Sequence, residues 1–480
     1  MQMISNFING ALVPAVSKEY IDGIEPATGA VYSKIPRSQK ADVDAAVSAA
    51  ENAFPSWSAT PAEVRASFLF RIADLLESRL DAFALAESRD QGKTVTTART
   101  VDIPRSIENF RFYATFITQM EEITVESKQC IHFALRKPIG VVGLVSPWNL
   151  PLYLATWKIA PAIAFGNTCV IKPSELTPMT VFLLCSVLQE AKLPPGVVNV
   201  VHGYGPECGQ AIAEHPGIPA ISFTGGTVTG KRLASTTAPL LKKLSLELGG
   251  KNANIVFEDC DLADCVATSV RSSFTNQGEI CLCGSRILVQ RSVYASFLEQ
   301  FVAATKKFQV GDPQDASSNM GALISKAHLE KVMSYIQIAK DEGGTIVLGG
   351  ERPTKLSARC REGFFLLPTI ITGLPPSARC NQEEIFGPVV TVIPFDTEEE
   401  AIRIANGTQY GLSATVWTGN AKRANRVSQQ LDTGYVWVNC WLIRDLRMPF
   451  GGVKASGIGR EGGKFAMDFY TEVKTVCSKL

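Results

Sequence analysis

The sequence predicts an α/β fold built from two doubly wound units, and two observations lead to this prediction. With 480 residues the chain exceeds the size at which one hydrophobic core stops growing, so two or three structural units are expected. From Gly140 onward, short β-branched runs alternate with longer windows of helical periodicity. Strand–helix–strand connections join parallel strands with a right-handed crossover, so the alternation predicts parallel sheets covered by helices.

The first third of the chain is expected to be mostly helical. Apolar residues recur at helical spacing over residues 41–54 and again over residues 61–90. This spacing is typical of amphipathic helices that bury one face.

Two alternating series follow this helical region. In the first series, the expected strands are 141–146, 168–172, 197–201, 220–224 and 244–248, and the expected helices are 152–164, 179–191, about 206–213, and one beginning at Val228. The second series begins at Asn254 and runs to about Asn439, with strands such as 286–289 and 415–417. Each series predicts one α/β unit.

Two segments alternate with period two near the ends of these units, at 130–135 and 469–477. Such strands are expected either to form a projecting ribbon whose open edge pairs with another subunit, or to form an ordinary hairpin packed on its own domain.

The composition favours small-molecule partners. A formal net charge of +1 gives no field that would attract nucleic acid or anionic lipid. The twelve cysteines lack metal-ligand spacing and the four histidines lie far apart in the sequence, so neither a disulfide framework nor a metal site is predicted. The amino terminus has no signal or transit pattern, and prolines interrupt the most apolar stretch, so a cytoplasmic protein without membrane spans is expected.

Glycine turns between predicted strands and helices suggest a nucleotide site. The turn at 203–209 departs from G-x-G-x-x-G spacing and is equally typical of an ordinary turn. Gly225 and Gly226 also lie between a strand and a helix, where free backbone N–H groups bind a pyrophosphate. Lys172 and Glu175 follow a strand at the edge where open sheets bind ligands, although a solvated pair on a loop explains them as well.

Cys281 lies in a loop between a predicted helix and a predicted strand, and a buried structural cysteine is the commoner fate of such a residue. However, the loop occurs together with other segments, and the set resembles the signature segments of the aldehyde dehydrogenase superfamily in order and spacing. These segments are 146–151, 246–252, 274–286, 383–388, 449–457 and 459–461. The resemblance extends over essentially the whole chain.

The resemblance implies an aldehyde dehydrogenase-like fold in three parts. These are a Rossmann-type NAD-binding domain (1–119 and 140–249), an α/β catalytic domain (250–440), and a bridging β-ribbon (120–139 and 463–480) that builds a homodimer or homotetramer. It also implies the site residues: Cys281 as nucleophile, Glu247 as general base and Asn149 as oxyanion donor, with a cofactor site formed by Ser146, Trp148, Lys172, Glu175, Gly225, Gly226, Glu384 and Phe386.

The implied chemistry is oxidation of an aldehyde through a thioester on Cys281. The Cys281 thiolate attacks the aldehyde carbon, the Asn149 amide holds the resulting alkoxide, and Glu247 deprotonates the water that hydrolyses the thioester. With no histidine nearby in sequence, a positive nicotinamide and loop amides must stabilise the thiolate.

Two residues depart from the family pattern, and a third has no assigned role. Glu279 stands where glutamine is usual, which puts a carboxyl of undetermined protonation near the nucleophile. Gly226 replaces a serine, which removes a hydroxyl contact but keeps the backbone donor. Cys283 is interpreted as a bystander.

The segments 100–106 and 439–445 are not general family motifs, and they resemble the branch of the superfamily that oxidises a small carboxylate-bearing semialdehyde in the kynurenine pathway of tryptophan catabolism. That resemblance implies that Arg105 and Arg444, together with Phe450, bind the substrate. A solvated surface arginine is the plain alternative for each guanidinium.

Three rival functions remain open at this level. The chain is also compatible with an oxidase of apolar aldehydes such as retinal, with a coenzyme-A-acylating enzyme, and with a non-catalytic protein that kept the fold. The joint presence of Cys281, Glu247 and Asn149 argues against the last of these.

Overall fold

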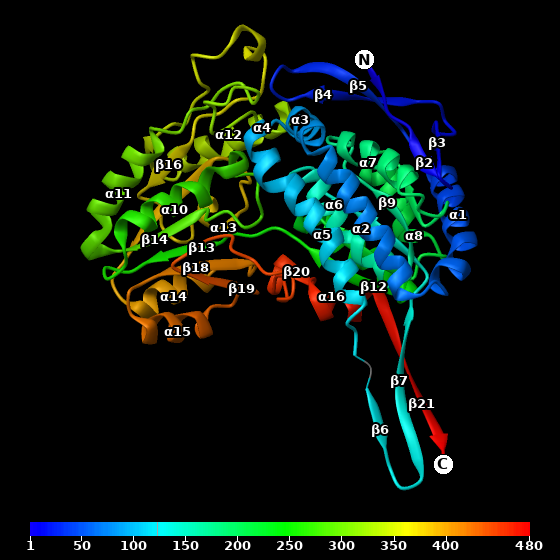
Figure 1. Cartoon of the computed structure of the whole chain (residues 1–480). Coiled ribbons are helices and arrows are strands. Elements are labelled where there is room, and N and C mark those ends of the chain that lie inside the picture. The colour runs from blue at the N-terminus through cyan, green and yellow to red at the C-terminus, as the bar shows by residue number, and fades with distance from the viewer. Residues whose placement is uncertain (122) are drawn as a thin grey trace.

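Two large sheets covered by helices form the body of the molecule, and a narrow ribbon projects from it (Figure 1). The computed structural model describes residues 1–121 and 123–480. Both large sheets are mixed with a parallel centre, as the alternation of strands and helices predicts.

The first sheet has eight strands, of which five form a parallel centre and three edge strands are joined through antiparallel pairs. In spatial order they are β20 (Gly457–Ile458), β12 (Lys243–Glu247), β11 (Ala220–Thr224), β8 (Val141–Val145), β9 (Thr168–Lys172), β10 (Val198–Val200), β2 (Asn6–Ile8) and β3 (Ala11–Val13). The five central strands were all expected from the sequence within about a residue at each end.

Helices on both faces bury this sheet. They are α1 (Lys40–Ser58), α2 (Ala62–Ser78), α3 (Leu80–Gln91), α4 (Val95–Thr97), α5 (Ile103–Ile117), α6 (Pro151–Ala164), α7 (Met179–Glu190), α8 (Gln210–Glu214) and α9 (Thr227–Thr237). The apolar stripe of α2, including Leu69, Ile72 and Leu76, is fully buried together with Phe110 of α5 and Ile163 of α6. This packing is what the period of the apolar residues predicts for amphipathic helices.

The second sheet has seven strands and is parallel except for its first pair. Its order is β15 (Thr345–Leu348), β16 (Thr369–Thr372), β17 (Val389–Phe395), β14 (Arg286–Gln290), β13 (Ala253–Val256), β18 (Ser413–Trp417) and β19 (Tyr435–Val438). Its helices are α10 (Leu262–Phe274), α11 (Arg291–Thr305), α12 (Lys326–Asp341), α13 (Arg379–Gln382), α14 (Glu398–Asn406) and α15 (Ala421–Gln430).

The chain joins the two sheets twice, and both crossings lie beside the predicted catalytic residues. The short segment 248–252 links the end of β12 to the start of β13. After β19 the chain returns to the first sheet, where Ile458 of β20 pairs with Leu246 of β12. Residues at the carboxyl ends of the first sheet therefore face loops of the second.

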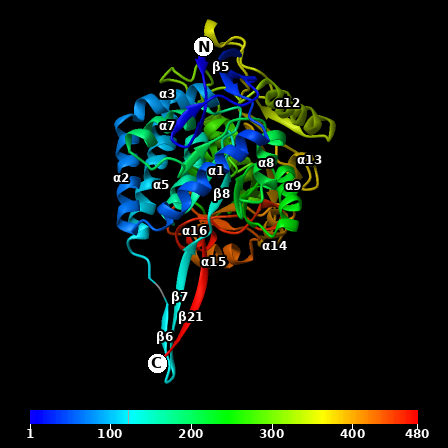
Figure 2. The same cartoon turned by 90° about the vertical axis from the view of Figure 1, so that its right-hand side faces the viewer.

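A three-stranded ribbon of β6 (Thr124–Glu126), β7 (Cys130–Pro138) and β21 (Thr471–Lys479) extends away from both sheets and carries the carboxyl terminus (Figures 1 and 2). β7 and β21 pair antiparallel along their whole length, from Thr471 opposite Pro138 to Lys479 opposite Cys130. Of the two predicted alternatives, the chain takes the projecting form rather than a hairpin lying on its own domain.

Three sequence expectations are wrong in detail. The first third is not simply helical, because β1 (Gln2–Met3), β4 (Tyr20–Glu25) and β5 (Ala30–Pro36) form a separate small sheet before the first helix, beside β2 and β3. The segment 61–90 is two helices that meet at Arg79. Residues 463–470 belong not to the ribbon but to α16 (Gly463–Tyr470), which packs on α6 and buries Met467, Phe469 and Tyr470.

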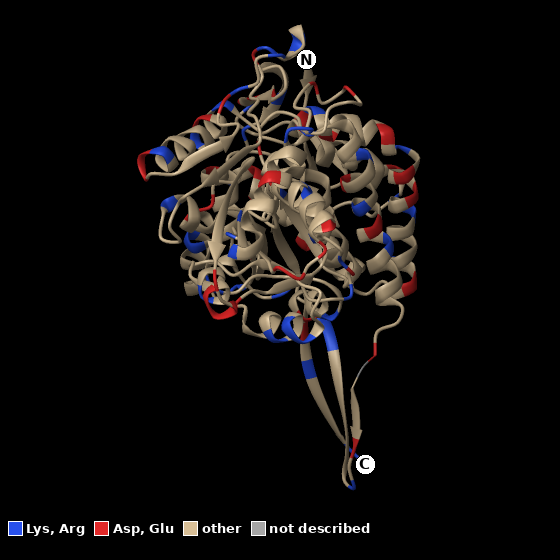
Figure 3. Cartoon of the chain, turned by 90° about the vertical axis from the view of Figure 1, so that its left-hand side faces the viewer, with Lys and Arg blue, Asp and Glu red and all other residues tan. Residues whose placement is uncertain are grey.

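Acidic and basic side chains are distributed over the whole body without one dominant patch (Figure 3), in accord with the net charge of +1. Within the described residues, no helix is both long and apolar enough to cross a membrane.

Candidate active site

A cavity of about 260 Å³ lies where the two units meet. Seven of the residues singled out from the sequence line it: Cys281, Asn149, Trp148, Gly225, Gly226, Glu384 and Phe386. The structure thus places the candidate nucleophile, the oxyanion donor and part of the candidate nucleotide site around one space.

The loop that carries Cys281 has a constrained backbone. After α10 ends, Asn276, Gln277 and Gly278 adopt φ values of 54°, 57° and 70°, in the left-handed region. The Asn252 side-chain amide then donates to the carbonyl oxygen of Cys281 at 2.7 Å and to that of Cys283 at 2.9 Å. These contacts fix the loop and leave the Cys281 side chain partly exposed in the cavity.

Cys281 rests as a thiol in this environment. Burial raises its pKa, and the carboxyls of Glu247 and Glu384 add to the increase, while Arg444 acts in the opposite direction. Ionisation of the thiol therefore requires further positive charge or hydrogen-bond donors at the cavity.

Glu247 ends β12 and is buried, with 5% of its surface exposed. Its Oε1 atom has no hydrogen-bond partner among the described residues. Burial raises its pKa well above the ordinary glutamate value; Glu461 adds to the increase, and Lys158 and Arg444 oppose it. A carboxyl with a raised pKa is a stronger base once it ionises.

The Asn149 side chain is buried and held in one orientation. Its Nδ2 donates to the Glu279 backbone carbonyl oxygen at 2.9 Å. The main chain is held as well, because the backbone carbonyl oxygen of Asn149 accepts from Lys93 Nζ at 3.0 Å and from Asn276 Nδ2 at 3.1 Å. The amide has a second hydrogen. Lys93 in turn pairs with Asp102 in the fully buried interior.

The first turn of α9 fits an anionic group. Gly226 is its N-cap and has no side chain to satisfy the first N–H groups. A Cβ atom built at Gly226 would meet nothing within 4 Å, so the space in front of the helix is open. The Gly225 N–H is already used, since it donates to the Glu247 carbonyl oxygen at 3.0 Å.

Lys172 and Glu175 meet at the carboxyl end of β9, where Lys172 Nζ lies 3.1 Å from Glu175 Oε2. Ser146 lies on the neighbouring strand end, and its N–H donates to the Lys172 carbonyl oxygen. None of the three lines the cavity around Cys281. The 203–209 turn does not line that cavity either; its Gly209 faces the Lys172 stem.

On the opposite wall, Glu384 and Phe386 are held by contacts to other loops. Glu384 Oε1 accepts from the Gly250 N–H at 2.9 Å, and burial raises its pKa. Phe386 has φ of 61°, its carbonyl oxygen accepts from His328 Nε2 at 2.6 Å, and its ring meets Trp148 edge-on at 5.3 Å. Sequence reasoning missed His328, which lies in no motif.

The carboxyl of Glu279 does not act on the nucleophile. Its oxygens accept from the Ile324 N–H at 3.1 Å and from Gln91 Nε2 at 2.7 Å, in a fully buried position. Burial raises its pKa well above the ordinary value, and the hydrogen bonds from Ile324 and Gln91 oppose this increase. Cys283 is buried too, and burial raises its pKa to about 12.

Arg105 and Arg444 converge on one face of α6. Arg105 lies over the rings of Tyr153 and Trp157, and its Nε and Nη2 atoms are buried without a partner among the described residues. Arg444 donates to the Tyr153 hydroxyl at 3.3 Å and stacks on the Phe450 ring at 3.7 Å. Only one Arg105 contact is an ion pair, with Glu108 at 3.0 Å.

A buried polar cluster behind Glu247 was not predicted. Lys158 Nζ lies 2.8 Å from Ser222 Oγ and 3.2 Å from Glu461 Oε1. A lysine within the apolar helix 152–164 was the available signal, because a buried charge requires a partner. The partner itself lies too far along the chain for sequence patterns to identify it.

Comparisons with known proteins identify the family of the chain. The Aldehyde dehydrogenase family model matches residues 12–476. The chain is 54% identical to 2-aminomuconic semialdehyde dehydrogenase from Bos taurus over 99% of this chain and 98% of the relative. It is 47% identical to 2-hydroxymuconic semialdehyde dehydrogenase from Pseudomonas sp. strain CF600, with both chains covered fully.

Solved structures give the same result. An NAD+ complex of aldehyde dehydrogenase from Bacillus cereus superposes with a TM-score of 0.97 at 40% identity, covering 100% of this chain and 97% of that one. P. syringae indole-3-acetaldehyde dehydrogenase, solved with NAD+, also gives 0.97, at 38% identity and with 99% and 96% covered. With its fold, its family match and its full-length relatives in agreement, the chain belongs to the aldehyde dehydrogenase family.

Proposed function

We propose that this enzyme oxidises a small semialdehyde that carries a carboxylate, of the 2-aminomuconate 6-semialdehyde type, to the corresponding dicarboxylate with NAD. The convergence of Arg105 and Arg444 on Trp157 of α6, with Arg444 close enough to Glu247 and Cys281 to oppose the rise in the pKa of both, carries this proposal. The full-length relatives named 2-aminomuconic semialdehyde dehydrogenase, from Bos taurus and Mus musculus, support it at 54% and 55% identity. This assigns the enzyme to tryptophan catabolism through kynurenine.

The arginine pair suits an anionic substrate end. The Nε and Nη2 atoms of Arg105 are buried and have no partner among the described residues, which is costly unless a ligand pairs with them. A guanidinium forks onto a carboxylate through two parallel hydrogen bonds, a geometry that lysine cannot reproduce. Tyr153 and Phe450 hold the Arg444 plane from two sides and so orient it.

The residues present also fit NAD. The open first turn of α9 receives the pyrophosphate, Lys172 and Glu175 bind the adenosine ribose, and Glu384 and Phe386 hold the nicotinamide ribose and ring. NAD, when bound, supplies the acceptor for the hydride that leaves the Cys281 adduct. The NAD+ complexes of the B. cereus and P. syringae relatives support this cofactor.

Three side chains perform the covalent chemistry. The Cys281 thiolate attacks the aldehyde carbon, and the free Asn149 amide hydrogen and the Cys281 N–H stabilise the alkoxide. Glu247 then removes a proton from the water that hydrolyses the Cys281 thioester. Its buried position suits this step, because a raised pKa makes the ionised carboxylate a stronger base.

The chain divides into an NAD-binding domain (1–119 and 140–249), a catalytic domain (250–440) and a ribbon. The carboxyl-terminal strand of the ribbon begins at residue 471. The exposed edges of the ribbon favour a homodimer or homotetramer. Twelve free cysteines favour a reducing, cytoplasmic location.

The test compares NADH formation with 2-hydroxymuconic semialdehyde and with neutral hexenal, in the wild type, Arg105→Ala and Arg444→Ala. A charge-assisted hydrogen bond contributes about 1.5–3 kcal/mol, so each variant should lose about 10- to 150-fold in kcat/KM for the acidic aldehyde and little for the neutral one. Arg105→Lys should show an intermediate loss. Equal losses on both aldehydes would contradict the acidic-substrate assignment.

The same assay, run with added coenzyme A, distinguishes the proposed enzyme from a coenzyme-A-acylating enzyme. Hydrolysis by water gives rates that do not depend on coenzyme A, whereas a thiol-acylating enzyme requires it. A requirement for coenzyme A would contradict the role of Glu247 in activating water. It would leave the binding of the carboxylate by Arg105 and Arg444 unaffected.

A further inference from the structure

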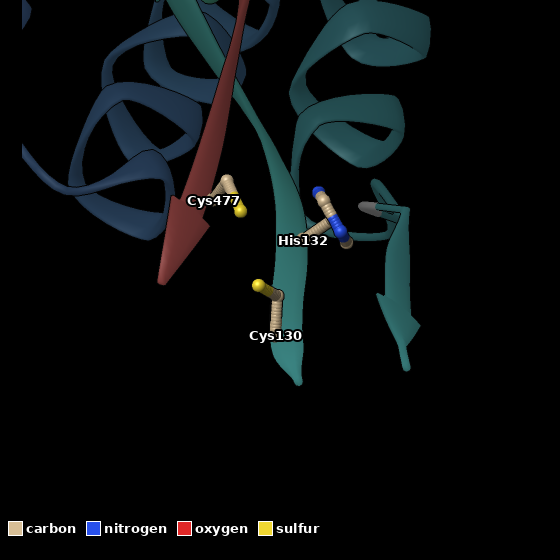
Figure 4. Close-up of side chains that lie close together, drawn as sticks. All are labelled: Cys130, His132 and Cys477. Atoms are coloured by element: carbon tan, nitrogen blue, oxygen red, sulfur yellow. The ribbon is translucent and has the colours of Figure 1, made fainter. Parts of the chain in front are cut away.

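We propose that Cys130, His132 and Cys477 bind one Zn²⁺ ion on the projecting ribbon. The sequence predicts no metal site because Cys477 is far from the other two residues along the chain. The fold brings them together: one ligand atom from each side chain lies within 4.8 Å of both others. Figure 4 shows the two sulfur atoms turned toward one another, with His132 beside them on β7.

Strand register places the three side chains on one face. Cys130 and His132 are two residues apart on β7, so they point to the same side of the ribbon. Cys477 of β21 is paired directly with His132, and directly opposed residues in an antiparallel pair share a face. The Leu480 N–H donates to the Gln129 carbonyl oxygen at 3.0 Å, which keeps this register to the end of the chain.

The donor set selects zinc. Two thiolates and one imidazole are the soft and borderline ligands that zinc takes, with bond lengths of about 2.3 Å to sulfur and about 2.0–2.1 Å to nitrogen. A tetrahedral ion with these bonds holds its ligand atoms about 3.5–3.8 Å apart. Side-chain rotations that bring the atoms together by about 1 Å therefore complete the site.

The charges also balance. Binding displaces the two thiol protons to solvent, and the two thiolates neutralise the dication. A water molecule takes the fourth position, since all three side chains are accessible to solvent.

A disulfide between the two cysteines is the competing fate of the same thiols. Cys130 and Cys477 are diagonal rather than directly opposed in the register. Diagonal Cα atoms lie about 7–8 Å apart, beyond the Cα separation of about 4.4–6.8 Å that a disulfide spans.

The consequence of zinc binding is a fixed carboxyl terminus. β21 is an outer strand held to the ribbon only by its pairing with β7. An ion bound by Cys477 of β21 and by Cys130 and His132 of β7 links the two strands and anchors the last residues of β21. Because the ion binds only the paired strands, it stabilises the pairing by a free energy that rises with the logarithm of the ion concentration once that concentration exceeds the dissociation constant.

The experiment titrates Co²⁺, a spectroscopic substitute for Zn²⁺, into the reduced, metal-stripped full-length chain. The parent variant carries Cys281→Ala, which removes the accessible active-site thiol as a rival ligand. We expect one Co²⁺ per chain with a thiolate-to-cobalt absorption band, displaced by Zn²⁺. Cys130→Ser, His132→Ala and Cys477→Ser should each weaken binding at least about tenfold, which corresponds to about 1.4 kcal/mol.

Cys260→Ser is the matched control, because Cys260 is another partly exposed thiol and lies outside the ribbon. It should bind cobalt as the parent does. In the Cys281-containing protein, Zn²⁺ should slow hydrogen exchange in β21, and His132→Ala should abolish this effect while leaving dehydrogenase turnover unchanged.

Three results would overturn the proposal: no cobalt uptake by the parent, a band that survives Cys130→Ser and Cys477→Ser, or a band lost equally in Cys260→Ser. Resistance of Cys130 and Cys477 to alkylation before reduction would establish the disulfide instead.

Discussion

Glu247 determines how the enzyme should respond to pH. Its pKa is raised in the folded protein by burial and by Glu461, so the side chain is neutral at low pH and ionises only above the ordinary glutamate range. Thioester hydrolysis should therefore increase with pH through that raised pKa.

Pre-steady-state NADH formation measures this directly. The wild type should give a burst at low pH, where hydrolysis is slow, and a burst that shrinks as pH rises. Glu247→Gln should give a burst and a slow steady phase at every pH, because the amide takes no proton from water. Loss of the burst itself in Glu247→Gln would show that Glu247 acts before hydride transfer.

Glu175 should determine the choice of cofactor. Its carboxylate is bound to Lys172 at the end of β9, where a ribose 2′-phosphate would lie against it. Juxtaposed like charges cost several kcal/mol, so NAD should be preferred to NADP by about tenfold or more in kcat/KM. Glu175→Ser should reduce the ratio of kcat/KM for NAD to kcat/KM for NADP. Equal kcat/KM of the wild type with both cofactors would show that Glu175 does not lie at the ribose in the complex.

At the scale of residues, sequence reasoning reached those that lie in strand-end motifs, such as Cys281, Asn149 and Gly225, and the structure brings these around one cavity. It assigned no role to Tyr153, nor to Glu461 of the signature segment 459–461, because both roles depend on contacts across the fold. Nor did it determine the state of Glu279, because that depends on Gln91 and Ile324, which come from distant segments.

Among the elements, the loop between α10 and β14 has a backbone that tolerates no side chain at Gly278. Gly278 has φ of 70°, and a Cβ atom there would lie 2.2 Å from the Gly387 carbonyl oxygen. Gly278→Ala should therefore displace both the Cys281 loop and the Phe386 turn. We expect a loss of more than about 1 kcal/mol in the free energy of unfolding, together with a fall in kcat.

Gly343→Ala is the matched control for this prediction. Gly343 has φ of 87°, but a Cβ atom there would meet nothing within 4 Å. It therefore has the same backbone cost without the clash, and it should leave kcat unchanged. Chemical denaturation and steady-state kinetics of the two variants provide the comparison; a Gly278→Ala enzyme with normal kcat would show that the loop tolerates the shift.

Element prediction succeeded where an element has its own periodicity. The central strands and α2 carry enough apolar repeats to be recognised alone. β2 and β3 have only three residues each and exist because they extend the sheet beyond β10, so no local pattern identifies them. α16 was mistaken for strand because Phe469 and Tyr470 end a short helix immediately before β21.

For the whole molecule, the ribbon is the feature that a monomer does not explain. Its side chains are largely exposed, including Val125 and Val473, and its outer strands have free edges. Light scattering of the full-length chain should give the mass of a dimer or tetramer, and removal of residues 474–480 should shift the population toward smaller species. A monomeric full-length chain at micromolar concentration would contradict this role.

The proposed reaction depends on a thioester that Cys281 forms with an acidic semialdehyde. Its most direct test is mass spectrometry of Glu247→Gln after mixing with NAD and 2-hydroxymuconic semialdehyde, since this variant should accumulate the intermediate. We expect one acyl group per chain, on the peptide that contains Cys281. We expect none in the variant that also carries Cys281→Ala. Stoichiometric NADH with no acyl adduct, or an adduct on Cys283 instead, would contradict it.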